Sequence, residues 1–420
     1  MELQFTEEQE KWRQHIKDFL DEEVRNAPPG YFADDMMTDI HETDEHWNWT
    51  REFTKRIGAQ GWISMGWPSK FAKWGGREAR PIETAIYSEQ MALHQATLAY
   101  GALTLGPPIL THGSEELQEE FLPRIAAGEI SCMLGLSESD AGSDLANAKT
   151  RAVKQPDGDY IINGHKIFSS MGHRCDYVIL LVVTDPTARK RYGFSRFAVD
   201  LKSPGVTITP WWNMSGRGHR QNQVFFDDVR VPARNLVGVE NQAWGEMNRD
   251  RGGGAGITGV NLKMLFNKFV KYCQETERNG QPLSKDPIVR HKLGELGVEV
   301  DVMLQMSWAA VAARDKAHGR PIEGVGGGIH TSASAILDTM RKEWMPRFAM
   351  AATQIAGPLA QVRGNPIAHL QEGAKWAPVV GDIPGWIERY YRAHAFDNHR
   401  HGSPEVLRMI LATRGLGLPR

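Results

Sequence analysis

A loop of small polar residues, LSESDAGSDLANAK, has side chains that could hold a ligand. Its hydroxyls and carboxylates come from Ser137, Ser139, Asp140, Ser143 and Asp144. Such a loop exposes backbone N–H groups and hydroxyls, which can bind a polar heterocycle or a phosphate. A surface turn has the same composition, so on these residues alone both interpretations stay open.

A glycine motif later in the chain, Gly254 to Gly259, has the letters of the dinucleotide-binding pattern GxGxxG. That pattern requires a hydrophobic strand directly before it. The preceding residues here, GEMNRDRGG, are polar and helical in character, which argues against a nicotinamide site. We expect these glycines to allow close packing of another helix or of a ligand.

Three histidines near the end of the chain, His394, His399 and His401, lie close to Asp397 in the sequence. These are metal-ligand residue types, but the spacings H-x4-H and H-x-H match no metal motif. We interpret each histidine as partly exposed and predict no metal site.

The composition is that of a soluble globular enzyme, with 41% hydrophobic and 24% charged residues among 420. The 49 basic and 51 acidic residues give a formal net charge of −2, which favours neither nucleic acid nor an anionic membrane. No stretch reaches the ~18 apolar residues of a membrane span, and the N-terminus lacks the apolar core of a signal peptide. Cys132, Cys175 and Cys273 are widely separated, as expected of reduced thiols in the cytoplasm.

The elements that must position these residues change character twice along the chain. Residues 1–131 show mostly helical apolar spacing, and Thr6 with Gln9 predicts a capping box at the first helix. Residues 132–240 contain short β-branched and aromatic runs between Gly, Pro and Asp-Gly, which predict an antiparallel β unit. Residues 241–420 return to long helical patterns. The sequence therefore predicts an α+β chain of three domains with these boundaries.

Five segments, taken in order and spacing, resemble the acyl-CoA dehydrogenase family of FAD-dependent enzymes over nearly the whole chain. They are LSESDAGSD, NGHKIFSSMG, VFFDDVRVPARNLVG, ERNGQPLSKDPIVRHKLGE and GSPEVLRMILATRGLGLPR. The resemblance implies an N-terminal helical domain, a central β-barrel-like domain and a C-terminal four-helix bundle, assembled as a dimer or tetramer. It also implies that a carboxylate takes the α proton of an acyl-CoA while flavin N5 takes the β hydride.

The resemblance implies flavin and substrate contacts from several parts of the chain. The implied flavin contacts are Leu134, Leu136, Ser137, Ser143, Phe168, Ser169, Ser170 and Ser403, with Gln354 and Gly357 at the adenine half across a subunit contact. Ser143 lies in the family near the flavin phosphates or the pantetheine arm of the substrate. Gly402 implies a backbone N–H that polarises the thioester carbonyl and so stabilises the enolate.

Two features depart from the family pattern. Thr276 stands where family members commonly have an arginine that reaches the neighbouring subunit's flavin, and Arg278 is out of register. The residues after Gly357, PLAQVRGNP, also replace the usual glycine-rich step. Flavin contacts across the subunit interface therefore do not follow from the resemblance, whereas the other flavin contacts do.

The position of the usual catalytic glutamate, directly before Gly402, holds His401. A minority of the family places the base on a helix early in the C-terminal domain, next to an arginine, and the matching pair here is Asp250 and Arg251. The resemblance thus implies Asp250 as the α-proton base and Arg251 as a contact for the CoA or an acidic substrate group. On residue type alone, Asp250 could also be a solvated helix-surface charge.

Three roles for His401 stay open. It could be the base, since neutral imidazole has a suitable pKa; it could position the substrate; or it could mark a disabled site. Our leading hypothesis is an acyl-CoA dehydrogenase that passes electrons to an electron-transfer flavoprotein or similar acceptor. The alternatives are a non-catalytic subunit paired with a paralogue, and a flavin enzyme of the same fold with different thioester chemistry, such as an oxidase.

Overall fold

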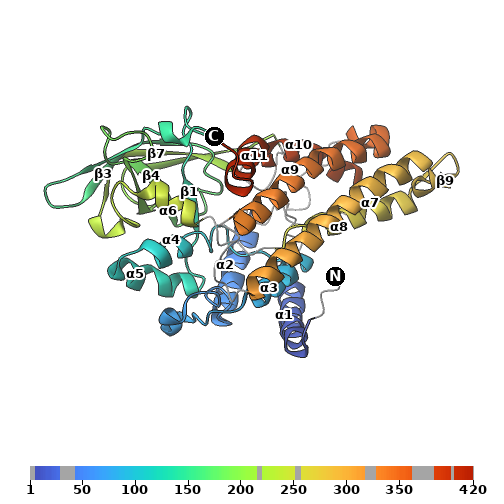
Figure 1. Ribbon diagram of the computed structural model, residues 1–420, viewed down its shortest axis with the longest axis horizontal. Helices are drawn as coiled ribbons and strands as arrows, with labels where there is room; N and C mark the ends of the chain where they lie inside the picture. Colours follow the sequence, from blue (N-terminus) through green and yellow to red (C-terminus); the bar gives the residue numbers. More distant parts are fainter. Residues whose placement is uncertain are drawn as a thin grey trace.

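The computed structural model describes residues 5–28, 43–214, 220–250, 257–316, 328–361, 383–398 and 402–419. Figure 1 shows helices α1 to α5 in blue to cyan, then a sheet of mostly green strands, then long helices in yellow to red. This order of helices, strands and helices confirms the predicted α+β class.

The helices before the sheet are α1 Glu7–Arg25, α2 Asp44–Ala59, α3 Pro81–Leu93, α4 Gly106–His112 and α5 Glu115–Ala126. The predicted capping box at α1 is confirmed: the Gln9 N–H donates to Thr6 Oγ1 at 3.3 Å, and the Thr6 N–H donates to Gln9 Oε1 at 2.9 Å. Ile16 and Leu20, one turn apart, are fully buried on the inner face of α1.

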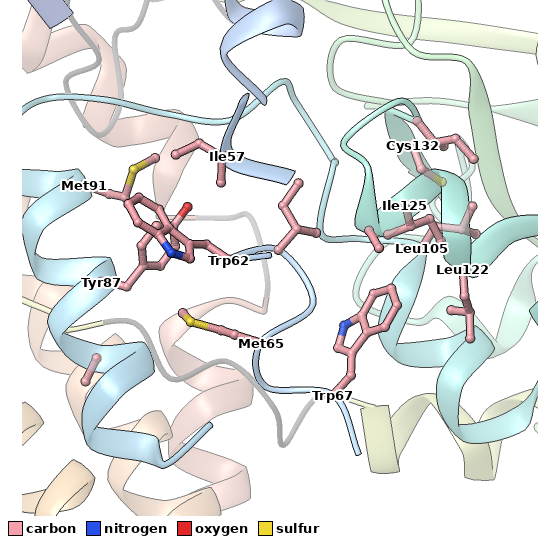
Figure 2. Close-up of a cluster of buried hydrophobic side chains, with 14 of the residues drawn as sticks. Ile57, Trp62, Met65, Trp67, Tyr87, Met91, Leu105, Leu122, Ile125 and Cys132 are labelled. Carbon is pink, nitrogen blue, oxygen red and sulfur yellow. The ribbon is translucent and has the colours of Figure 1, made fainter. Parts of the chain in front are cut away.

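The core between these helices is rich in tryptophan. Figure 2 shows Trp62 beside Tyr87 of α3, and Trp67 on the side of Ile125 of α5. The rings of Trp62 and Tyr87 meet edge-on at 5.7 Å. Cys132, the first residue of the sheet, belongs to the same buried cluster, so the sheet begins inside the helical core.

The central strands are β1 Cys132–Gly135, β2 Arg151–Lys154, β3 Tyr160–Lys166, β4 Tyr177–Val183, β5 Phe194–Asp200, β6 Val206–Trp211 and β7 Gln221–Val231. They form one sheet in the order β1-β4-β2-β3-β7-β6, and β5 pairs with β4. Most pairings are antiparallel as predicted, but β1 and β2 each run parallel to β4. The β-branched and aromatic runs DYIINGHK, DYVILLVV, GFSRFAVD, GVTITPW and QVFFDDVRV predict β3 to β7. The sequence misses β1 and β2, because four residues carry too little alternation.

The helices after the sheet are α6 Ala243–Asp250, α7 Val260–Glu275, α8 Pro287–Lys316, α9 Gly328–Ala356, α10 Ile383–Asp397 and α11 Pro404–Ile410. Helices α7 to α10 pack together as the expected four-helix bundle. At its centre, Trp344 stacks on Phe348 at 4.7 Å, and the Trp344 indole donates to the Leu296 carbonyl at 2.9 Å. The indole hydrogen bond joins α9 to α8.

Helix α8 is long and apolar enough, by length and composition, to cross a membrane. Its buried side chains Leu296, Val300 and Met303 lie in the core that α7 and α9 share. The core helix of a bundle has the same composition, so this packing accounts for the apolar sequence.

Arg51 of α2 joins the N-terminal helices to the sheet. Its guanidinium donates to the Asp176 carboxylate, to Ser131 Oγ at 3.1 Å and to the Glu129 carbonyl at 2.8 Å. The Ser131 N–H also donates to Asp176, at 2.9 Å. Burial alone would raise the pKa of the Asp176 carboxyl, but the Ser131 N–H and the Arg51 guanidinium outweigh it and hold the pKa below its usual range.

We predict that Arg51→Met lowers the free energy of unfolding by about 1–3 kcal/mol at pH 7, because it removes charged hydrogen bonds from a half-buried carboxylate. A carboxyl whose folded pKa is lowered stabilises the fold above its unfolded pKa, and this contribution disappears as pH falls through the folded pKa. Urea unfolding between pH 5 and pH 2 should therefore show a smaller acid-side loss in Arg51→Met than in the wild type.

Arg230→Met is the matched control, because Arg230 pairs with Asp157 and Asp159 at an exposed position. Equal effects of the two substitutions at every pH would contradict the role of Arg51.

Candidate functional site

The segment that follows β1 and the segment that follows β3 are joined by hydrogen bonds. The Ile167 N–H donates to the Ser137 carbonyl at 2.9 Å. The Lys166 ammonium donates to the Leu136 carbonyl at 3.1 Å. The predicted flavin contacts Leu136 and Ser137 are thereby brought next to Phe168, Ser169 and Ser170.

A buried ion pair lies beneath this junction. Lys166, with no exposed side-chain surface, donates to Glu138 Oε1 at 2.7 Å. The Thr150 hydroxyl donates to the same oxygen at 2.7 Å, and the Lys149 N–H donates to Oε2 at 2.6 Å. Burial would raise the pKa of Glu138, but the Lys166 charge and the Thr150 hydrogen bonds hold it below its usual range. Burial lowers the pKa of Lys166, against the opposing effect of Glu138.

An exposed apolar surface lies next to this junction. Leu134 is 43% exposed between buried neighbours of β1. Phe168 is 53% exposed and adopts a left-handed backbone conformation, with φ +53°. Its ring meets Trp211 of β6 edge-on at 5.4 Å. Exposed apolar side chains of this kind can contact a planar ring system.

Serine hydroxyl groups lie next to Phe168 in the same segment. Gln221, fully buried, donates from Nε2 to Ser170 Oγ at 3.1 Å. The Ser169 N–H donates to the Asn222 carbonyl at 3.1 Å, while the buried Ser169 hydroxyl has no hydrogen-bond partner among the described residues. Ser143 lies farther along the loop, in an exposed turn. Apolar side chains next to hydroxyls and backbone groups can contact an isoalloxazine ring, so these residues are compatible with a flavin.

Gln354 and Gly357 lie at the C-terminal end of α9. Gln354 is exposed, and Gly357 has φ +68°, a left-handed conformation suited to glycine. The Arg278 guanidinium donates to the Ile355 carbonyl, one of the last carbonyls of the helix. Arg278, out of register with the family's arginine, is therefore used to cap α9 within its own chain.

Gly402 and Ser403 lie at the start of α11, which packs on α9. Gly402 has φ +92°, and its carbonyl accepts a hydrogen bond from the ammonium of Lys342 of α9. Lys342 and Gln354 are twelve positions apart on α9, which corresponds to roughly 18 Å along the axis. Gly402 thus contacts the middle of α9, whereas Gln354 and Gly357 lie at its C-terminal end.

Helix α6 ends at Asp250, one turn after Glu246. The Arg196 guanidinium of β5 donates to Glu246 Oε2 at 3.3 Å, and both side chains are almost fully buried. The Val239 N–H donates to Glu246 Oε1 at 3.0 Å. Gly238, at φ +93°, leaves room for the carboxylate where a Cβ would lie 2.1 Å from it. The start of the helix that carries Asp250 is therefore fixed to the sheet.

Several predicted site residues lie outside the described part of the chain: the side chain of Asp250, and all of Arg251, His399 and His401. Of the three C-terminal histidines only His394 is described, and burial lowers its pKa. Within the described ranges no three His, Cys, Asp or Glu side chains gather as a metal site would require. The roles of Asp250, Arg251 and His401 therefore stay predictions.

The glycine motif follows helix α6 rather than a strand, as the sequence indicates. Gly254 and Gly256 lie outside the described residues. At Gly259, with φ +105°, an added Cβ would lie 3.2 Å from the Leu304 nitrogen of α8, so this glycine does permit close packing.

The sequence does not single out Trp211, Gln221 or Lys342. A signal existed for Lys342: it stands three and seven residues before Met345 and Ala349, which are fully buried on α9. A lysine in register with a buried helix face needs an internal acceptor. Trp211 and Gln221 are opposite each other on β6 and β7, a pairing that only the strand register reveals.

Three family models cover most of the chain. They are the acyl-CoA dehydrogenase N-terminal domain over residues 6–129, the middle domain over 133–229 and the C-terminal domain over 238–416.

Similar proteins carry the same family name. Acyl-CoA dehydrogenase FadE29 of Mycobacterium tuberculosis is 31% identical over 412 residues, or 96% of each chain. Probable acyl-CoA dehydrogenase YngJ of Bacillus subtilis is 28% identical and covers 93% of this chain and 98% of its own. Among solved structures, the ChsE4–ChsE5 complex from Mycobacterium tuberculosis is 26% identical, matches with a TM-score of 0.80 and covers both chains fully.

We predict that Glu138→Gln lowers the free energy of unfolding by about 3–5 kcal/mol at pH 7, because it leaves the buried Lys166 ammonium without its counter-charge. Adding Lys166→Met should regain most of the lost free energy of unfolding, since the double variant no longer buries an unpaired charge. Urea unfolding of both singles and the double gives the coupling free energy directly.

The control is Lys149→Met, whose ammonium lies 3.5 Å from Asp140 with both side chains largely exposed. A double variant as unstable as Glu138→Gln alone would show that an unpaired Lys166 ammonium is not the cause of the loss.

Proposed function

The chain belongs to the acyl-CoA dehydrogenase family, and from that premise we propose that it binds FAD and uses Asp250 as the base. Membership of this family makes the protein a flavin-dependent oxidoreductase that acts on the CH–CH group of an acyl-CoA thioester. The observation that carries the cofactor proposal is the exposed apolar surface of Leu134 and Phe168, edged by the Ser137 and Ser170 segments.

The flavin, when bound, accepts the hydride from the β carbon of the substrate. The chain's own residues hold the ring and the thioester. Phe168 and Leu134 give the ring apolar contacts, and Ser170, oriented by Gln221, offers a hydroxyl at its edge. Gly402 offers its backbone N–H to the thioester carbonyl, which stabilises the negative charge that develops there as the α proton leaves.

Asp250 is supported as the base by its place at the end of α6. The Glu246–Arg196 pair fixes the preceding turn to β5, so a carboxylate at the end of α6 has a firm support. A base that removes a proton beside a thioester works best with a pKa raised toward neutrality, which burial under a bound substrate provides. In this proposal His401 positions the substrate.

We predict that Asp250→Asn slows anaerobic bleaching of the flavin by an acyl-CoA about 10²–10⁴-fold, because general-base catalysis contributes that much. His401→Ala should slow it less than tenfold. The measurement is stopped-flow absorbance of the flavin band against a panel of short, long and ring-bearing acyl-CoAs, and the fastest member gives the substrate class.

Asp301→Asn is the matched control, because it removes an exposed carboxylate of α8 that pairs with Lys263. If His401→Ala abolishes bleaching while Asp250→Asn does not, the histidine is the base and the assignment to Asp250 is wrong.

A second candidate function is that of a subunit paired with a paralogue. Two observations favour it: His401 occupies the usual base position, and the similar ChsE4–ChsE5 structure is described as a complex of two proteins. The remote Gln354–Gly357 corner, roughly 18 Å from the Gly402 contact along α9, would then complete the flavin site of the other subunit.

Mass measurement of the native assembly, alone and co-expressed with a base-bearing paralogue, separates the two candidates. A homo-oligomer with one flavin per chain that bleaches with an acyl-CoA supports the leading proposal. A stable mixed assembly, with half the expected flavin and no bleaching by this chain alone, supports the second. Slow reoxidation of the reduced flavin by air would support transfer of electrons to an electron-transfer flavoprotein or similar acceptor, and fast reoxidation would indicate an oxidase.

A further inference from the structure

We propose that Asn222 is a positioning residue for the flavin: its side-chain amide holds the turn of residues 168–171, which presents Phe168 and Ser170 to the ring. This inference rests on the proposed function. Asn222 is the second residue of β7 and lies 53 positions after Ser169, the residue of the turn that it binds.

The turn of residues 168–171 contains two residues in an unfavourable backbone conformation. Phe168 has φ +53° and Met171 has φ +56°, both in the left-handed region that a Cβ disfavours. Such a conformation persists only where the surrounding structure holds it. The Met171 side chain is fully buried, whereas that of Phe168 is about half exposed, so apolar packing holds the Phe168 end of the turn less firmly.

Asn222 forms hydrogen bonds on both sides of Ser169, in the middle of the turn. The Asn222 Nδ2 group donates to the Ser169 carbonyl at 2.7 Å, and the Ser169 N–H donates to the Asn222 carbonyl at 3.1 Å. The Ser169 carbonyl lies in the same peptide plane as the Ser170 N–H, and the Ser169 N–H lies in the same plane as the Phe168 carbonyl. The two bonds therefore restrict both peptide planes that flank Ser169.

The side-chain bond also sets the direction of a backbone donor. The Ser170 N–H, in the peptide plane that the Asn222 amide holds, has no acceptor among the described residues. The Ser170 hydroxyl, in contrast, is already hydrogen-bonded to Gln221. An N–H group with a fixed direction and no acceptor in the chain is suited to an oxygen or nitrogen atom of a bound heterocycle.

His173 determines which way the Asn222 amide faces. His173 Nδ1 lies 3.1 Å from Asn222 Oδ1, while Asn222 Nδ2 has carbonyl acceptors on Ser169 and, at 3.4 Å, on Arg220. The amide nitrogen must face these carbonyls, so the oxygen faces His173 and Nδ1 carries the imidazole proton. Burial lowers the pKa of His173 to about 4, against the opposing effect of the Asn222 hydrogen bond, so the ring is neutral at pH 7.

The Asn222 amide is enclosed by the turn and β7. Asn222 has no exposed surface, and an added Cβ at Gly172 would lie 3.4 Å from Asn222 Cγ and 2.7 Å from Met133 Sδ of β1. Without the amide, the buried Ser169 carbonyl would keep only the Gly172 N–H, at 3.4 Å. Loss of this one side chain should therefore loosen the turn while the backbone bond between Ser169 and Asn222 remains.

The test uses the full chain, with and without FAD, and needs no turnover. Hydrogen exchange followed by mass spectrometry measures how often the N–H groups of residues 169–172 lose their hydrogen bonds in the flavin-free chain. Fluorescence titration of the flavin-free chain gives the Kd of FAD. At saturating FAD, circular dichroism of the visible flavin band reports how firmly the protein orients the ring.

Asn222→Ala should speed exchange at residues 169–172 about 10-fold and raise the Kd of FAD by about the same factor, the effect of losing one buried hydrogen bond from a preorganised site. The circular dichroism of the flavin should weaken. His173→Leu should cause smaller changes of the same sign, because the amide loses the donor that orients it. His173→Asn, whose amide can replace the Nδ1–H, should restore the wild-type values.

Asn163→Ala is the matched control. The Asn163 amide joins β3 to β7 by donating to Asp228 at 2.9 Å, at an exposed position away from the turn. This substitution should leave the exchange of residues 169–172, the Kd of FAD and the flavin circular dichroism as in the wild type.

Thermal unfolding of each variant distinguishes a loosened turn from a loosened fold. If Asn222→Ala does not fold, the two His173 variants carry the test, and equal behaviour of His173→Leu and His173→Asn contradicts the proposal. The proposal is also wrong if Asn222→Ala folds with an unchanged Kd of FAD, whatever its exchange, or if Asn163→Ala has the same effect. A wild-type chain that binds no FAD refutes the proposed function instead.

Discussion

The Lys166 ammonium at the end of β3 binds the Glu138 carboxylate and the Leu136 carbonyl, and so joins two segments that lie 28 positions apart in the sequence. Together with the Ile167 N–H bond to the Ser137 carbonyl, this junction places the segment that carries Phe168 and Ser170 next to Ser137. A flexible loop would lose affinity for a planar cofactor, since its ordering would oppose binding. The ion pair is thus the constraint from which the flavin side of the site is built.

The proposed thioester contact at Gly402 depends on α9 in a similar way. Trp344 and Phe348 bury this helix in the bundle core, and the Trp344 indole binds the Leu296 carbonyl of α8. Helix α9 contacts the Gly402 carbonyl through Lys342 at its middle, and its C-terminal end at Ile355 accepts a hydrogen bond from Arg278. These two contacts lie roughly 18 Å apart along the helix axis, so α9 supports two separate proposed contact points.

The sequence predicts what depends on local pattern and misses what depends on register. The Thr6–Gln9 capping box and strands β3 to β7 follow from residue types within a few positions of one another. The parallel pairing of β1 with β4 joins segments 45 positions apart, and four-residue strands carry too little alternation to reveal it. Among the site residues, the serine-rich loop was visible as a motif, whereas Gln221 and Trp211 are recognisable only when β6 and β7 are placed side by side.

Three buried cations, Lys166, Arg196 and Lys342, share one arrangement: each binds a segment next to a proposed site residue. A core built only for stability would place apolar side chains there, because desolvation makes buried ion pairs a poor source of stability. What they provide is direction, since a charged hydrogen bond fixes the distance and angle of its acceptor more closely than apolar packing does. Dehydrogenation needs the flavin ring, a base and a carbonyl-polarising N–H in register, and the residues proposed to hold or supply them come from separate segments of the chain. Buried charges at the three junctions are therefore what we expect of a site whose parts must keep one relative position during catalysis.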